Sequence, residues 1–330
     1  MSRKPDKNVY EKEARKGLFF MVMASVFFSF MGAMVNYAQI LEPEGSPLVS
    51  SFVRLIVNIL VIAGVAWHSG ELWKLPGDRR PSLWARGFFG ALSLIFVMYG
   101  IHAIGVGETS FLHASNSIII AALSPFVLRQ ANSRLAWVAI AGATIGLWFL
   151  AQPRFEDHNP AGRIVALLSG VWAAIAYLMI ARAGRSNSSN TVIFYLCGVG
   201  MMLHMLIFMG NGAGVPVPGS ATGIVWPRRP VTYGFLVGAG VMASVAQFFL
   251  TAAYQSAPAA LNAAVSYLTP VLNLGWSVFV FGRHPDGLAL AGAAMVLVCG
   301  VALPVIGVSA RKKTKQAHAA KAQDSESLSL

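Results

Sequence analysis

The sequence predicts an all-α integral membrane protein with ten transmembrane helices, arranged as two inverted five-helix repeats. Three observations predict it: the composition, a series of uncharged apolar runs, and the alternation of basic residues between those runs. Of the 330 residues, 56% are hydrophobic and only 12% are charged, and a water-soluble surface cannot be built from these proportions. The mean hydropathy is +0.61. Together these values exclude a typical cytosolic enzyme, a secreted disulfide scaffold and a disordered regulator.

Uncharged runs of about 20 residues, the length that crosses a bilayer as a helix, recur along the chain. Membrane strands do not fit, because alternating ten-residue segments are absent and Gly, Ala and Leu dominate. The first run is too long, and its flank too charged, for a cleaved signal peptide, so we expect a retained span. The expected spans are residues 17–40, 48–67, 84–104, 109–128, 135–151, 164–181, 192–209, 231–253, 258–281 and 288–308.

The formal net charge of +12 raises the question of nucleic-acid binding, which the placement of the 25 Lys and Arg residues excludes. They gather at the two termini and in every second break between spans. With both termini in the cytoplasm, the inside segments hold eighteen basic residues and the outside breaks hold four. This asymmetry predicts a multi-pass protein of the cell (inner) membrane. Cys197 and Cys299 lie inside apolar runs and indicate packing, so we expect no metal and no cofactor.

A repeat is visible in the polar residues of the spans. Five spans per half turn the second half upside down, so any internal repeat must be inverted. In the ninth span, polar residues fall on one helix face, and a shift of 153 brings four of the five onto polar residues of the fourth span. An alternative shift of 145 aligns two Leu-Ser/Thr-Pro triplets but loses this match. The two polar stripes are Thr109, His113, Asn116 and Ser124, and Asn262, Ser266, Thr269, Asn273 and Ser277.

The repeat predicts five regions. Residues 1–16 form a basic cytoplasmic N-terminus, residues 17–151 the first repeat, residues 152–163 an outer linker and residues 164–308 the second repeat. Residues 309–330 form a cytoplasmic tail, which we expect to be disordered from Ala317 onward because it is rich in Ala, Ser, Gln and Leu.

The expected spans contain short motifs: Gly17 to Phe20 with Phe27, Phe28 and Phe30; Phe52 to Arg54; Arg86-Gly87 with Gly90; Ile104 to Thr109; Ala257 to Ala260; Ser266 to Pro270; and Phe281-Gly282. In this order and at this spacing, they resemble the EamA-type members of the drug/metabolite transporter superfamily. The resemblance covers about residues 17–308 and implies ten helices in two inverted repeats around a substrate cavity, with membrane transport of small metabolites. The chain departs from the family at Arg129-Gln130 and Gly282-Arg283, where Gly-Glu is common.

The polar stripes are the predicted substrate cavity. Amide and hydroxyl groups can hydrogen-bond a polar substrate, and aromatic faces can hold an apolar or cationic part. The alternative for any one residue is hydrogen bonding between helices, which uses the same side chains. The predicted cavity residues are Thr109, His113 and Asn116 facing Asn262, Ser266 and Thr269, with Tyr99, Gln247, Tyr254 and Trp172 as walls.

A charge within a span marks a second candidate site. Arg54 lies seven residues into the second span, about 9 Å below its outer end, where an isolated charge costs about 2.5 to 3.5 kcal/mol. Glu108 is the acid at a span edge on the same side and is the expected partner. We predict an outer gate or ion pair from Arg54, Glu108 and His102, or an anchor for a substrate carboxylate at Arg54. The alternatives are a structural brace, or bonds from Arg54 to free backbone carbonyls. His102 and His113 could also make this gate pH-sensitive.

These features predict a secondary transporter that moves a small metabolite by alternating access. Its partners would be a small-molecule substrate and membrane lipid. The sequence also allows a homodimer. An amino acid, nucleoside, vitamin or drug-like compound would fit the cavity composition. One alternative is an integral-membrane enzyme, but the chain lacks HExxH, Gly-x-Ser-x-Gly, paired membrane aspartates and a Cys-His arrangement. The other is a non-transporting sensor or assembly protein, which polar stripes would also suit.

Overall fold

The computed structural model describes residues 7–104, 106–130, 132–152, 159–183, 186–212, 224–280, 282 and 285–302. All regular elements within these ranges are helical, as expected. They are α1 (Lys7–Leu41), α2 (Pro47–His68), the 3-10 turn η1 (Leu72–Lys74), α3 (Pro81–Ile104), α4 (Val106–His113), α5 (Asn116–Val127), α6 (Arg134–Ala151), α7 (Pro160–Ala183), α8 (Ser189–Gly212), α9 (Pro230–Ser256), α10 (Ala259–Ser266), α11 (Leu268–Phe279), α12 (Gly287–Val296) and the π-helical η2 (Leu297–Ala302).

Eight helical segments of the described chain, from Lys12–Leu41 to Pro230–Ser256, are long and apolar enough to cross a membrane. They coincide with the first eight expected spans. The expected ninth span is two shorter helices, α10 and α11, and the tenth consists of α12 followed by η2, so the count of ten stays a prediction. The expected tail and the end of the tenth span lie outside the described residues.

Prolines set where several helices begin. Proline has no N–H to lose in the first helical turn, and its fixed φ suits that position. The helix starts therefore need not coincide with the apolar runs. Helix α3 begins three residues before the run that predicted it, which moves its charged residues deeper into the helix. The helices that begin in this way are α2 at Pro47, α3 at Pro81, α7 at Pro160 and α9 at Pro230.

The fourth and ninth spans are each interrupted in the middle by a turn. The break between α4 and α5 falls at residues 114–115, and the break between α10 and α11 falls at Tyr267. Carbonyls near these breaks receive side-chain donors, as a backbone away from water requires. The Asn116 amide donates to the carbonyl of His113 at 2.9 Å, and the Tyr267 hydroxyl donates to that of Ala114 at 3.1 Å.

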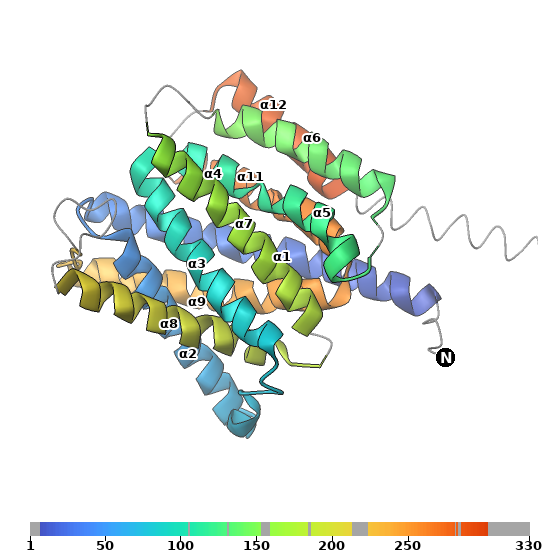
Figure 1. Ribbon diagram of the computed structural model, residues 1–330. Coiled ribbons are helices and arrows are strands. Elements are labelled where there is room, and N and C mark those ends of the chain that lie inside the picture. The colour runs from blue at the N-terminus through green and yellow to red at the C-terminus, as the bar shows by residue number, and fades with distance from the viewer. Residues whose placement is uncertain are drawn as a thin grey trace, which may run out of the picture.

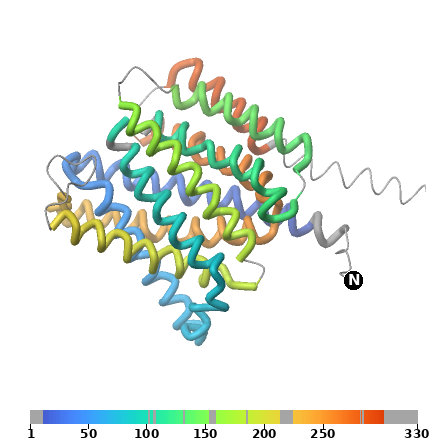
Figure 2. The backbone as a smooth tube through the Cα atoms, in the orientation of Figure 1, coloured from blue at the N-terminus to red at the C-terminus, as the bar shows by residue number. Residues whose placement is uncertain are grey.

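The two halves pack in matching ways. Helix α1 packs along α9, and its equivalent in the second half, α7, packs along α3 (Figure 1). In the same way, α3 contacts α8, and α2 contacts α9. Helices α6 and α12 lie side by side along one edge (Figure 2). Glycines allow the close contacts: a Cβ at Gly17 would lie 2.7 Å from the backbone nitrogen of Ala257, and one at Gly162 would lie 2.8 Å from Ile104 Cγ2. The shift of 153 relates Ile104 to Ala257. Gly17 and Gly162 are 145 residues apart, because the second half has the longer break near residues 210–230. With this difference in loop length, the two contacts are equivalent.

Candidate functional site

The two polar stripes lie on helices that contact each other. The Ser117 hydroxyl of α5 donates to the carbonyl of Ala263 in α10 at 3.0 Å. The Tyr267 hydroxyl reaches back to Ala114, the residue 153 positions earlier. The bounds of α4 and α10 also differ by 153 at both ends, so the two breaks occupy equivalent positions. The broken helices therefore cross at their equivalent points.

Stripe residues of the fourth span form contacts with neighbouring helices. Thr109 is buried beside Gly100, whose Cβ would lie 2.9 Å from Thr109 Cγ2. His113 Nδ1 lies 2.9 Å from the hydroxyl of Ser169 on α7. Asn116 is buried and bonds to the backbone at the helix break. His113 and Asn116 are therefore hydrogen-bonded within the fold, whereas the hydroxyl of Thr109 is buried without a hydrogen-bond partner among the described residues.

Stripe residues of the ninth span behave similarly. Asn262 is fully buried, and its amide donates to the carbonyl of Ala253 at 2.8 Å. The Ser266 hydroxyl donates to that of Ala263 at 2.8 Å, and Thr269 is half-buried. The bonds of His113 and Asn262 join neighbouring helices, as in the alternative interpretation, whereas those of Asn116 and Ser266 are local. Asn262 Oδ1 is buried without a hydrogen-bond partner among the described residues.

The predicted wall residues lie on α3, α7 and α9. Tyr99 is half-buried on α3. Gln247 is buried on α9 and accepts a hydrogen bond from Arg86 Nη2 at 3.3 Å. Tyr254 stacks on Tyr177, with ring centroids 5.3 Å apart. Trp172 stacks on Phe89 at 5.5 Å. Gln247 thus lies against an arginine that we did not include among the site residues.

The predicted pair of Arg54 and Glu108 is wrong. Glu108 is buried on α4 and accepts from Arg163 Nε of α7 at 2.7 Å. Arg54 lies on α2 over the ring of Phe28 in α1, with its guanidinium carbon 5.9 Å from the centroid. The reason is the packing: α4 lies against α7, whereas Arg54 has α1, α7 and α8 as neighbours. The side chain of His102 lies outside the described residues.

Arg86 is the functional candidate that the sequence reasoning missed. The expected span 84–104 places Arg86 near its start, but α3 begins at Pro81, five residues before Arg86. Its side chain is only 2% exposed. It is in electrostatic range of Arg54, and both arginines have Tyr177 and Cys197 as neighbours. The position of Pro81 before the apolar run was the signal that could have found it.

We define the arginine site as Arg54, Arg86, Tyr177, Cys197 and Gln247. It draws on five helices, α2, α3, α7, α8 and α9. Nε of both arginines is buried without a hydrogen-bond partner among the described residues. Guanidinium groups donate only, so this arrangement suits an acceptor and not a metal ion. Elsewhere, the described residues contain no group of three or more His, Cys, Asp and Glu side chains placed to hold a metal.

Comparisons with known proteins match the whole bundle. The model of the EamA-like transporter family matches twice, over residues 15–152 and 160–305. The pseudopaline exporter CntI of Pseudomonas aeruginosa is 26% identical over 289 residues, covering 88% of this chain and 96% of that protein. The riboflavin transporter of Vibrio cholerae is 23% identical over 288 residues, covering 86% and 91%.

A further relative and a solved structure extend this likeness. Solute carrier family 35 member G1 of Mus musculus is 22% identical over 309 residues, covering 87% of this chain and 80% of that protein. One crystal structure shares the fold with a TM-score of 0.74 at 16% identity, covering 90% of this chain and 98% of the other. The family matches span nearly the full bundle in two copies, which confirms the resemblance seen in the motifs. The chain belongs to the EamA-like transporter family and is a multi-pass membrane transporter of small molecules.

Proposed function

We propose that this transporter moves a small metabolite across the cell (inner) membrane by alternating access between two inverted halves. The ten spans form repeats at residues 17–151 and 164–308, joined by an outer linker at 152–163. One half rocks against the other around a site near the middle of the membrane. Transport, and not catalysis, is the activity of this chain.

Contacts between equivalent positions carry this proposal. Ala114 and Tyr267 are 153 residues apart and share a hydrogen bond. The contact between α1 and α9 is likewise matched by the contact between their equivalents α7 and α3. Equivalent positions can touch only beside the axis that relates two halves. Figure 1 supports the inversion, because α1 ends at the side of the molecule where α7 begins.

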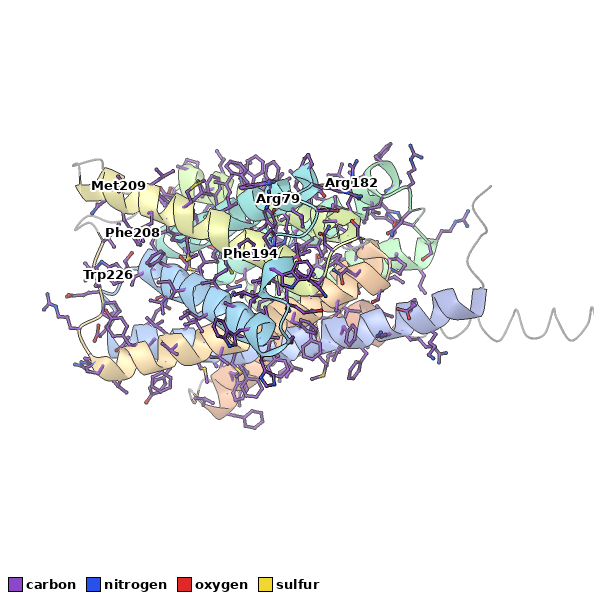
Figure 3. All side chains as sticks on the ribbon, turned by 90° about the horizontal axis from the view of Figure 1, so that it is seen from below. Arg79, Arg182, Phe194, Phe208, Met209 and Trp226 are labelled. Atoms are coloured by element: carbon purple, nitrogen blue, oxygen red, sulfur yellow. The ribbon has the colours of Figure 1, made fainter. Side chains whose placement is uncertain are left out.

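The orientation rests on the distribution of charged and aromatic residues. Figure 3 shows Phe208, Met209 and Trp226 at one end of the bundle, and Arg79 and Arg182 away from that end. Basic residues favour the cytoplasmic side, and aromatic residues favour the interfaces. We therefore place both termini in the cytoplasm. The names of the relatives, which concern pseudopaline and riboflavin, support a metabolite of moderate size as the substrate.

Locking one end of the bundle tests alternating access. In the loop after α2, Asp78 Oδ2 accepts from the Ser186 hydroxyl before α8 at 3.0 Å, so this contact joins the two halves. We would replace Asp78 and Ser186 with cysteine in a background carrying Cys197→Ala and Cys299→Ala, and measure metabolite flux in proteoliposomes. Oxidation should stop flux and a reductant should restore it. Each single cysteine serves as the control, and unchanged flux in the cross-linked protein would overturn the rocking mechanism.

A further inference from the structure

The arginine site has an unbalanced positive charge inside the bundle. Arg86 is almost completely buried, and Arg54 is half-buried between helices α1, α7 and α8. The ion pairs formed by the described residues are Lys74 with Glu71, Arg80 with Asp78, and Arg163 with Glu108. Neither arginine of the site takes part in them. The two guanidinium charges also repel each other.

A buried charge without a partner is unfavourable, so its presence needs a reason. A buried acid could neutralise this charge, but Glu108, the buried acid of the described residues, already forms an ion pair with Arg163. The neutral partner Gln247 accepts only one bond from Arg86, at 3.3 Å. The neighbours Tyr177 and Cys197 are polar but uncharged at neutral pH. The charge of this site is therefore not neutralised by any other side chain among the described residues.

The unused hydrogen-bond donors indicate the shape of the missing group. Nε of Arg54 and Nε of Arg86 have no partner among the described residues, and neither has the hydroxyl of Tyr254. Tyr254 stacks on Tyr177 and so extends the same cluster. Unpaired N–H and O–H donors beside two positive charges suit an oxyanion, which offers several acceptor lone pairs.

Aromatic rings surround this group of donors. The guanidinium of Arg54 lies over the ring of Phe28, and Tyr177 and Tyr254 stack on one another. Phe89, one turn along α3 from Arg86, stacks on Trp172. These faces suit the apolar or ring-shaped body of a ligand whose charged end lies at the arginines.

We propose that Arg54 and Arg86 bind an oxyanion of the transported substrate, a carboxylate or a phosphate, and that the surrounding aromatic rings hold its body. This inference rests on the proposed transport function and adds the substrate class to it. Arg86 supplies the more buried charge, and Arg54 the more accessible one. Release of the substrate then restores repulsion between the arginines, which favours binding of the next oxyanion.

Uptake of a defined mixture tests the substrate class without any mutation. Proteoliposomes and protein-free liposomes would receive an equimolar mixture of carboxylates, phosphate monoesters, neutral metabolites and cationic metabolites, and mass spectrometry would identify what is retained. We expect retention of compounds with a carboxylate or phosphate, and loss of retention when that group is converted to an amide or methyl ester. Retention of neutral or cationic compounds alone would overturn the oxyanion site and leave the transport function standing. No retention of any compound would overturn both.

Matched variants test the residues. Arg54→Gln and Arg86→Gln should each lower uptake of the retained oxyanion by about tenfold or more, because each removes a charged donor from the bound group. Arg182→Gln makes the same change at an exposed position and should leave uptake within about twofold. Arg86→Lys keeps the charge without the planar fork, so it should preserve uptake of a phosphate better than that of a carboxylate. Full uptake in a correctly folded Arg86→Gln protein would overturn the assignment.

Discussion

The crossing of the broken helices and the arginine site are both polar regions within an apolar bundle, but they differ in the charge of the groups left without a partner. At the crossing, Asn116, Ser117 and Tyr267 each donate to a backbone carbonyl. The buried atoms without a partner there belong to the neutral side chains of Thr109, Ser115 and Asn262. At the arginine site, the unpaired Nε atoms belong to two guanidinium groups, and neither group has an acid as partner. Polar residues in a membrane protein can thus stabilise the fold or bind a ligand, and an unpaired buried charge distinguishes the second role.

The largest effect should come from Arg86→Leu. Removing an uncompensated buried charge should leave the melting temperature of the ligand-free protein equal or higher, while uptake falls by about tenfold or more. Thermal unfolding and proteoliposome uptake on the same preparations measure both. A lower melting temperature with normal uptake would make Arg86 a structural residue, like those of the crossing.

Substitution of closely packed glycines should have the next largest effect, a loss of stability, because these glycines allow the helices to pack closely. A Cβ at Gly87 would lie 2.5 Å from the carbonyl of Tyr195, and one at Gly240 would lie 2.6 Å from Val57 Cβ. Gly87→Ala and Gly240→Ala should each destabilise by about 1 to 3 kcal/mol. Gly64→Ala, where nothing lies within 4 Å, is the control and should be neutral or slightly stabilising. Equal melting temperatures for Gly64→Ala and Gly87→Ala would contradict this packing.

Double-mutant cycles should show that Glu108 is coupled in stability to Arg163 and not to Arg54. Glu108→Gln and Arg163→Gln should be coupled by about 1 kcal/mol, because the two side chains form an ion pair at 2.7 Å. Glu108→Gln and Arg54→Lys should be additive within about 0.5 kcal/mol in stability, since they do not touch. Coupling between Glu108 and Arg54 would restore the outer gate expected from the sequence.

Tyr267→Phe should have a smaller effect, confined to stability. The hydroxyl of Tyr267 bonds to the carbonyl of Ala114 and lies 2.9 Å from the hydroxyl of Thr144. Its loss should cost about 1 kcal/mol, measured as a lower melting temperature. Tyr37→Phe, at an exposed ring, should cost nothing measurable. Loss of substrate binding in Tyr267→Phe would show that the crossing also binds ligand.

The smallest effect concerns pH at Glu42, in the loop after α1. Burial alone would raise the pKa of Glu42, but the backbone N–H groups of Arg228 and Arg229, and the hydroxyl of Thr232, outweigh it and lower the pKa below 4.5. The lowered pKa stabilises the folded state above about pH 4.5, and this gain is lost as pH falls through the folded value. Glu42→Gln should therefore be less stable than wild type at pH 7 and equal to it in strong acid. A difference that persists in acid would contradict this contribution.

The sequence predicts the helical class and the family because both depend on features that repeat over many residues. Composition, span length and the 153-residue shift each average over long segments. A single contact between two side chains does not average over a long segment, so the sequence alone does not predict it. The partner of Glu108 depends on which face of α4 meets α7, and the burial of Arg86 depends on α3 beginning at Pro81 and not where hydropathy rises. The breaks at residues 114–115 and at Tyr267 were missed because side chains from the other half supply the hydrogen bonds that permit them.

Ligand-induced stabilisation tests the distinction between the two regions most directly. The melting temperatures of wild type, Tyr267→Phe and Arg86→Gln would be measured with and without the oxyanion retained by the proteoliposomes, at about 100 times its Kd for wild type. We expect a stabilisation of about 2.7 kcal/mol in wild type and in Tyr267→Phe, and almost none in Arg86→Gln. An equal shift in Arg86→Gln would contradict the account.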